Sequence, residues 1–312
     1  MKKLIAFFIL TALIACSNED QTAPSLEASI KDSSVLTGKM LSFKTEESFI
    51  KEYSDLAKLN SEEIKNWVSS KKMVSLLNTS DTSKGIEADA VPESRLVYSD
   101  ALEAILNSES KVKIGDRVLW LNELNFYILP ANDIDKSADE LLSIKNNLEV
   151  FGQLLSSSQL KKSTTGRDVL PNENRVKTFA SAEMNVSGSR LRHVVDVFNE
   201  TIVLNDKIYT SKMYIRSILQ YRSCSTFSCS WKEASNLRML DSDFCQSCVP
   251  GAWGVIARVS TTSPVSGTQT YQIANWAPYT PLALYPNFYI LGPITCQIYG
   301  TVGFSSMELS WY

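Results

Sequence analysis

The chain contains one histidine in 312 residues, and this shortage narrows the chemistry that it can perform. His193 lies between Arg192 and Val194, at the expected start of a strand. A zinc site built from several histidines is therefore excluded, and any Ser-His-Asp or Cys-His mechanism would depend on His193 alone. The sequence has no Gly-x-Ser-x-Gly elbow near it and no glycine-rich phosphate loop. We therefore assign His193 a surface or packing role and predict no catalytic residue and no cofactor.

A dominant charge and a long apolar run are also missing. Lys and Arg number 31 against 34 Asp and Glu, for a net charge of −3, which argues against nucleic acid as a partner. The apolar run at residues 4–14 falls well short of the ~20 residues that a transmembrane helix needs. Apolar residues still make up 44% of the chain, so a wholly disordered or collagen-like protein is excluded.

The first residues of the chain follow the pattern of a secretory signal peptide. A positively charged segment precedes the apolar run of residues 4–14, and Ala15 and Cys16 follow that run. We interpret residues 1–15 as a lipoprotein signal peptide that is removed on export. The segment ending at Cys16 resembles the bacterial lipobox, and the resemblance implies that the Cys16 thiol is lipidated and becomes the new N-terminus. Several acyl chains such as palmitate would make membrane attachment lasting, since each buried CH₂ contributes about 0.8 kcal/mol.

The residues that follow Cys16 are polar. Residues 17–20, Ser-Asn-Glu-Asp, look like the acidic export tag that surface lipoproteins of Bacteroidota carry after the lipidated cysteine. Residues 16–40 as a whole are rich in Ser, Thr, Asp and Glu and lack apolar periodicity, so we expect a flexible tether. We therefore predict an outer-membrane lipoprotein whose N-terminal lipid makes the membrane its first partner. The acidic residues favour display at the cell surface, and an inward-facing position in the outer membrane is the alternative.

Residues 41–154 predict a small α+β module. Thr45 and Asn60 are placed to cap two amphipathic helices, and residues 99–107 predict a third helix. Gly115 and Asp116 separate two short apolar runs, which is typical of a β-hairpin. We also expect a strand at residues 124–129 and a helix at residues 137–147.

The same region resembles the N-terminal module of uncharacterised outer-membrane or surface lipoproteins of Bacteroidota. The resemblance rests on Phe49, Tyr53, Trp67 and residues 76–78, 106–107 and 112–116. It implies a location and an architecture but no catalytic residue, because that family has no assigned activity. The C-terminal half shows no such resemblance.

The second half of the chain predicts a different architecture. Residues 155–180 are polar and without an apolar period, so we expect an exposed linker and a domain boundary there. In residues 181–312, short alternating runs are separated by turn residues, most clearly at residues 212–222. This pattern predicts a mainly antiparallel β domain, either a sandwich or a barrel-like fold.

The cysteines cluster in this β-rich domain. Outside the cytoplasm thiols tend to be oxidised, so we expect two disulfides and one free thiol, with one or two bridges inside residues 224–248. A zinc site is the alternative, because four of these cysteines form two closely spaced pairs. Six cysteines less Cys16 leave Cys224, Cys229, Cys245, Cys248 and Cys296.

Residues 259–307 contain no charged residue but many aromatic ones. Tyr and Trp present stiff faces with a polar group, which suits stacking on sugar rings or anchoring a protein partner. We select Trp276, Tyr279, Tyr285 and Tyr289 as candidate ligand-binding residues, with a glycan or an envelope protein as the partner. The alternatives are that these rings fill the core of the β domain, or that the segment inserts into a membrane.

We therefore expect a membrane-anchored lipoprotein that acts as a binding or structural module in the cell envelope. One alternative is an envelope hydrolase that acts on a surface polymer through His193 or a pair of acids, and a second is a zinc-stabilised adaptor. We expect the acids of the β domain to lie at solvated strand ends; they are Asp196, Glu200, Asp206, Glu233, Asp241, Asp243 and Glu308.

Overall fold

The fold is α+β and mostly β-strand. A computed structural model describes residues 34–79, 96–155, 176–226, 228–246, 255–276, 289–290, 294–301 and 303–309. Residues 32–312 form one compact unit. In the described part of the chain, no helix is long and apolar enough to cross a membrane.

Four of the helices begin at a capping side chain, and two of these caps, Thr45 and Asn60, are the ones that the sequence indicates. Side-chain oxygens of Thr45, Asn60, Ser99 and Ser137 accept hydrogen bonds from backbone N–H groups of the first turn. These bonds provide acceptors for backbone N–H groups that otherwise have no partner within the helix. The predicted helices are confirmed in kind. They are α1 (Glu46–Leu56), α2 (Ser61–Lys71), α4 (Asp100–Ile105) and α5 (Ala138–Ile144). Helix α3 (Leu76–Thr79) and the 3₁₀ turns η3 (Ala131–Asp133) and η4 (Lys145–Asn147) were not predicted.

The strands form a 12-stranded and a 5-stranded sheet. The first sheet contains β1 (Ser34–Thr37), β2 (Met40–Phe43), β3 (Lys111–Ile114), β4 (Arg117–Asn122), β5 (Asn125–Leu129), β6 (Val150–Leu155), β7 (Val176–Ala180), β8 (Met184–Val186), β9 (Ser189–Leu204), β10 (Lys207–Cys224), β11 (Cys229–Glu233) and β14 (Gln269–Trp276). The second contains β12 (Arg238–Gln246), β13 (Val255–Ser260), β15 (Tyr289–Ile290), β16 (Ile294–Gly300) and β17 (Gly303–Leu309).

The predicted hairpin is the β3–β4 pair. Ile114 pairs with Arg117 across a two-residue turn. Gly115 takes a φ of 58° at the first turn position, a conformation that a side chain would oppose. This prediction is confirmed.

The large sheet runs through regions that we expected to be separate. Its strand order is β1-β2-β3-β4-β5-β6-β9-β10-β11, with β7 and β8 beside β9 and β14 beside β10. Because β6 pairs with β9, strands of the expected helical module and of the expected β-rich domain share one sheet. Residues 34–40, expected in the tether, form most of the β1–β2 hairpin, and residues 176–180, expected in the linker, form β7. Local composition indicates polarity but not which strand a segment pairs with.

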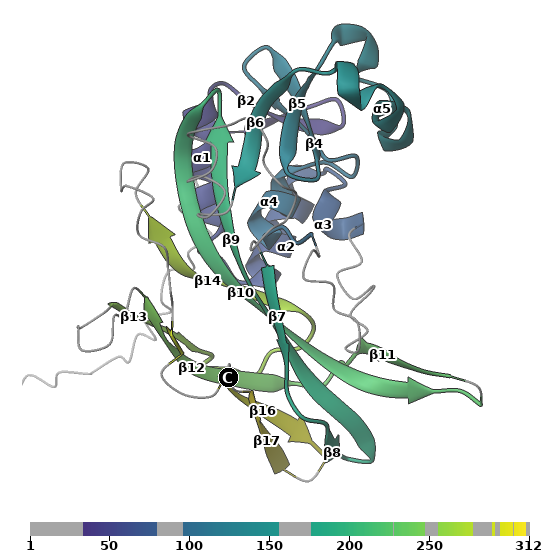
Figure 1. Ribbon diagram of the computed structural model, residues 1–312, viewed down its shortest axis with the longest axis vertical. Helices are drawn as coiled ribbons and strands as arrows, with labels where there is room; N and C mark the ends of the chain where they lie inside the picture. The colour runs from purple at the N-terminus through teal and green to yellow at the C-terminus, as the bar shows by residue number, and fades with distance from the viewer. Residues whose placement is uncertain are drawn as a thin grey trace, which may run out of the picture. The chain divides into compact units, whose positions relative to one another are not determined.

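The longest strand pair, β9 and β10 (Figure 1), carries one core on each of its two faces. On one face Phe198, Ile202 and Tyr214 belong to the core that helices α1, α2 and α4 cover. On the other face Val195 and Met213 belong to a second core. The alternation expected at residues 212–222 is therefore present, but both faces are buried.

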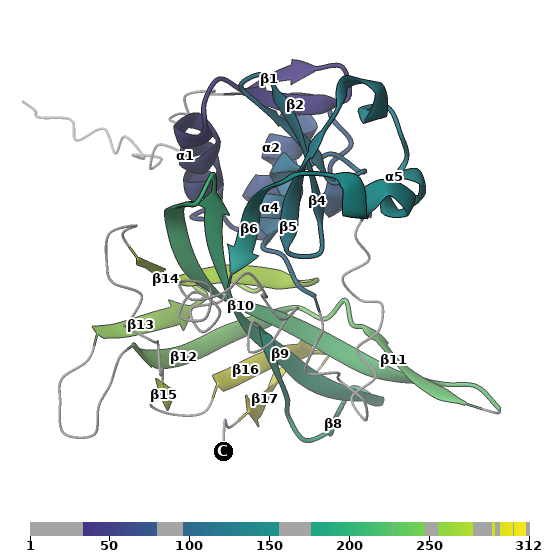
Figure 2. The same ribbon diagram turned by 45° about the horizontal axis from the view of Figure 1, so that its top comes forward.

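The second core is shared by the two sheets. Leu240, Cys296, Ile298 and Met307 of the 5-stranded sheet belong to the same cluster as Val195 of β9. In Figure 2, strands β12, β16 and β17 lie near the lower half of the β9–β10 pair. The two sheets therefore bury apolar side chains against each other, as a sandwich does.

Candidate functional site

A pocket of about 470 Å³ opens where the helices meet two loops of the β-rich part. Ser61 and Lys65 of α2 are four residues apart, so they share one face of that helix. Asp100 is the first residue of α4, and Glu233 is the last residue of β11. The full lining is Ser61, Lys65, Leu77, Asp100, Glu233, Ala234, Ser235, Ser266, Gly267 and Thr268.

One buried group in the lining of this pocket is the carboxylate of Asp100, which is only 6% exposed. Its Oδ2 accepts a hydrogen bond of 2.9 Å from Ser61 Oγ, and its Oδ1 accepts one of 2.7 Å from Thr270 Oγ1. The guanidinium of Arg216 lies 3.8 Å from Oδ1. Arg216 also donates to the backbone oxygen of Tyr98. A buried carboxylate requires such compensation, so Asp100 is already held by its own chain.

Another part of the lining is formed by Glu233 and the loop before β14. Thr268 Oγ1 donates a 2.8 Å hydrogen bond to Glu233 Oε1. Gly267 has a φ of 69°, and its backbone oxygen accepts a 2.7 Å hydrogen bond from Arg238 Nη2. A Cβ at Gly267 would lie 3.8 Å from Glu233 Oε1. The glycine therefore permits the turn that brings this loop beside the carboxylate.

A buried hydrogen-bond network fixes the start of α4 beside the pocket. The Glu200 carboxylate accepts hydrogen bonds from Ser99 N at 2.7 Å, Ser99 Oγ at 2.6 Å and the Tyr53 hydroxyl at 2.7 Å. The Tyr53 and Tyr214 hydroxyls are 2.8 Å apart. Burial and the neighbouring Glu200 charge raise the pKa of both tyrosines well above the ordinary value. Because Ser99 caps α4, this network sets the position of the residue after it, Asp100.

A second polar feature on the same face of the sheet is Lys212, which is 1% exposed and lies opposite Glu200 in the β9–β10 register. Its Nζ donates a 2.9 Å hydrogen bond to Asn275 Oδ1 and lies 5.7 Å from the Tyr53 ring. Burial, with a further contribution from the Lys58 charge, lowers the pKa of Lys212 to about 8. This lysine is a packed interior group and does not line the pocket.

His193 lies in the second core and is 0% exposed. Ser217 Oγ accepts a 3.2 Å hydrogen bond from Arg238 Nε and lies 2.8 Å from His193 Nε2. The other ring nitrogen, His193 Nδ1, is buried and has no hydrogen-bond partner among the described residues. Burial, assisted by the Arg238 charge, lowers the pKa of His193 to about 3. The packing role predicted for His193 agrees with this position.

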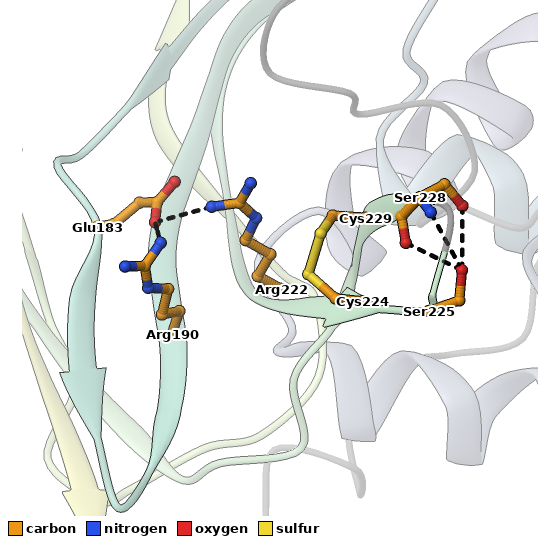
Figure 3. The surroundings of a disulfide bond; sticks show 7 residues. All are labelled: Glu183, Arg190, Arg222, Cys224, Ser225, Ser228 and Cys229. Atoms are coloured by element: carbon orange, nitrogen blue, oxygen red, sulfur yellow. Dashed lines mark hydrogen bonds and ion pairs between the residues drawn. A yellow bond between two sulfur atoms is a disulfide. The ribbon is translucent and has the colours of Figure 1, made fainter.

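Among the described cysteines one disulfide is present. Cys224 and Cys229 lie directly opposite each other in β10 and β11, with an S–S distance of 2.07 Å and a Cα–Cα distance of 4.0 Å. Figure 3 shows the bridge beside the turn that Ser225 and Ser228 close. The bonded pair offers no free thiolate to a metal.

The other cysteines are placed less fully. Cys296 is a free, buried thiol whose pKa burial raises to about 12. The backbone of Cys245 lies in β12, and Cys248 and Cys16 lie outside the described residues. Within the described ranges, no group of three or more His, Cys, Asp or Glu side chains could hold a metal ion.

Of the four aromatic candidates, two lie at the ends of described segments and two lie outside the described residues. Trp276 ends β14, where its backbone pairs with Ser211, and Tyr289 begins β15, where its backbone pairs with Cys245. Tyr279 and Tyr285 lie outside the described residues. Their proposed ligand contact stays a prediction.

The expectation that the acids lie at solvated strand ends is wrong for two of them. Asp196 and Glu200 are both 0% exposed, because the sheet face that carries them is covered by other elements. Asp206, Asp241, Asp243 and Glu308 are exposed, as expected. Of the seven acids, Glu233 lines the pocket; its companion there, Asp100, comes from the helical part and was not among them. The signal that could have indicated Asp100 was its position directly after a helix cap.

Comparisons with known proteins identify no family for this chain. No family model matches the chain, and no curated protein matches it. Among solved structures the chain is similar to a crystal structure of a DUF4848 family protein from Bacteroides thetaiotaomicron, with 14% sequence identity, 88% of this chain and 100% of that chain covered, and a TM-score of 0.22.

Proposed function

We propose that this chain is a lipid-anchored binding module of the bacterial cell envelope, and that the pocket at Asp100 and Glu233 holds a small polar ligand. The observation that carries the binding role is the pocket itself. It lies within the range of about 300–1,000 Å³ that is typical of small-molecule sites, and hydroxyl, carboxylate and ammonium groups converge on it from several elements.

The pocket is built in advance of any ligand. Asp100 and Ser61 are held by one hydrogen bond to each other, and Glu233 is held by a hydrogen bond from Thr268. Leu77 and Ala234 add apolar surface. A preformed site loses little side-chain entropy on binding, which favours binding over a structural role alone.

A ligand screen with a blocking variant tests the binding role. We expect small polar metabolites that bind to raise the melting temperature of the protein by a few degrees at saturating concentration. Ser235 is an exposed lining residue, so Ser235→Trp should fill the pocket and abolish the shift. Ser306→Trp, at an exposed serine of β17, is the matched control. A ligand-induced shift that persists in Ser235→Trp would show that the pocket is not the binding site.

The anchor rests on Cys16 and is tested separately. The full chain should partition into detergent and carry acyl groups by intact mass, whereas Cys16→Ser should remain in the aqueous phase. Equal partitioning of the two proteins would contradict the anchor and the outer-membrane location.

Glycan contact through the aromatic stretch is a second candidate, favoured by the uncharged, aromatic composition of residues 259–307. Replacing Trp276 and Tyr279 with Ala should abolish retention on a glycan array without changing the melting temperature. An equal loss of folding would mean that these rings are core residues instead.

The structure gives the two remaining alternatives less support. A polymer hydrolase that acted through His193, Asp196 or Glu200 would need these groups to be accessible, yet all three are 0% exposed. A zinc-stabilised adaptor would need the thiolates of Cys224 and Cys229, which are bonded to each other.

A further inference from the structure

We infer that the pocket selects a small zwitterion, an α-amino acid or dipeptide with a free ammonium and a free carboxylate. This inference rests on the proposed binding function and adds the chemical class of the ligand. The ligand class follows from the charged side chains of the pocket lining: some already have a partner in the protein, and others have an unpaired charge that a ligand can bind.

Asp100 is the charge that is already paired. Its two carboxylate oxygens accept hydrogen bonds from Ser61 and Thr270, and the Arg216 guanidinium lies 3.8 Å away. A ligand cation at Asp100 would have to displace donors that the fold holds in place. Asp100 therefore shapes the wall of the pocket and does not set the charge of the ligand.

Lys65 is the open positive charge. It is exposed on the same face of α2 as Ser61, and within the described part of the chain its Nζ takes part in no hydrogen bond or ion pair. An ammonium group at a pocket rim binds a carboxylate through charge-assisted hydrogen bonds. Hydroxyl groups of Ser235 and Ser266 lie in the same lining.

Glu233 is the open negative charge. Thr268 occupies its Oε1, whereas Oε2 has no hydrogen-bond partner among the described residues. Lys65 and Glu233 line one pocket without forming an ion pair with each other. An unpaired ammonium and an unpaired carboxylate oxygen in one lining complement a ligand that carries the reverse pair of charges.

The size and the apolar part of the pocket fit the same ligand class. An extended dipeptide spans about 7 Å, and a pocket of about 470 Å³ accommodates it with its side chains. Leu77 and Ala234 provide apolar contact for short side chains. Binding would thus combine two charge contacts at the ends with apolar contact between them.

The test is calorimetric titration of the full chain in detergent. The probes are alanine, alanyl-alanine, its N-acetyl and C-amide derivatives, and glucose. We expect alanine or alanyl-alanine to bind and each single-charge derivative to bind about tenfold more weakly, because a hydrogen bond to a charged group is lost. The alanine and alanyl-alanine titrations distinguish an amino acid from a peptide.

Two variants assign each end of the ligand. Lys65→Met should bind alanyl-alanine and its C-amide equally, and Glu233→Gln should bind alanyl-alanine and its N-acetyl derivative equally. Lys232→Met, on the opposite face of β11 from Glu233, and Glu308→Gln, on β17, are matched controls at exposed positions and should behave as the parent. Unchanged melting temperatures exclude a folding defect.

Failure of this inference and failure of the proposed function give different results. Equal affinity for alanyl-alanine and both derivatives, or no binding of any zwitterion, would overturn the zwitterion assignment. If glucose bound instead and Ser235→Trp abolished its binding, the pocket would remain the site and the ligand class alone would be wrong.

Discussion

The single histidine makes a sharp prediction about stability and pH. His193 is fully buried beside Arg238, and these surroundings lower its pKa from 6.5 to about 3. Between about pH 6.5 and pH 3 the unfolded chain therefore binds a proton at this site that the folded chain does not. Stability consequently falls as the pH is lowered through that window.

The magnitude follows from the two pKa values. Between pH 7 and pH 5, proton binding by the unfolded imidazole lowers the free energy of unfolding by about 2 kcal/mol. Carboxylates titrate mainly below this interval, and the chain has no other histidine to contribute. The contribution of His193 is thus large enough to distinguish from the pH dependence that the other titratable groups contribute.

Urea unfolding of a chain that begins at residue 32 provides the assay, because residues 32–312 form one compact unit. The parent should lose about 2 kcal/mol more than His193→Gln between pH 7 and pH 5. NMR of the single imidazole gives its folded-state pKa directly. An equal loss of unfolding free energy in the two proteins, or an imidazole that titrates near 6.5, would refute the conclusion that His193 is buried and neutral.

Two further predictions concern the buried network and the disulfide. Tyr53→Phe removes the hydroxyl that donates to Glu200, so we expect a loss of about 1.5–3 kcal/mol in urea unfolding; a loss below about 0.5 kcal/mol, the size expected for an exposed hydroxyl such as that of Tyr209, would show that the bond does not form. Cys224→Ser opens the short loop to Cys229 and should cost about 2 kcal/mol in the chain-entropy model, and peptide mapping without reductant that shows two free thiols in the parent would contradict the bridge.

The helical elements were predictable because their determinants are local. Thr45, Asn60, Ser99 and Ser137 each cap the helix that follows, and a cap acts within one turn. The turn at Gly115 is set in the same way by two residues. For these elements the sequence contains both the signal and its partner within a few positions.

The candidate site was not predictable, because its residues meet only through long-range pairing. Asp100 lies 133 positions before Glu233, and both line one pocket together with Lys65. In the sequence Asp100 is an ordinary acid in the first turn of a short helix. Its contact with Thr270 exists because β14 pairs with β10, a choice that no local pattern indicates.

The sequence by itself determined the capped helices, the β3–β4 turn and the alternation of β10, because each depends on neighbouring residues. The tertiary structure decided which faces are buried. The alternating pattern of β10 is the same for a strand with one face in water and for a strand between two cores. The helices cover one face of β10 and the second sheet covers the other, so both faces are buried. The same packing buries Glu200 and His193 and brings the pocket residues together.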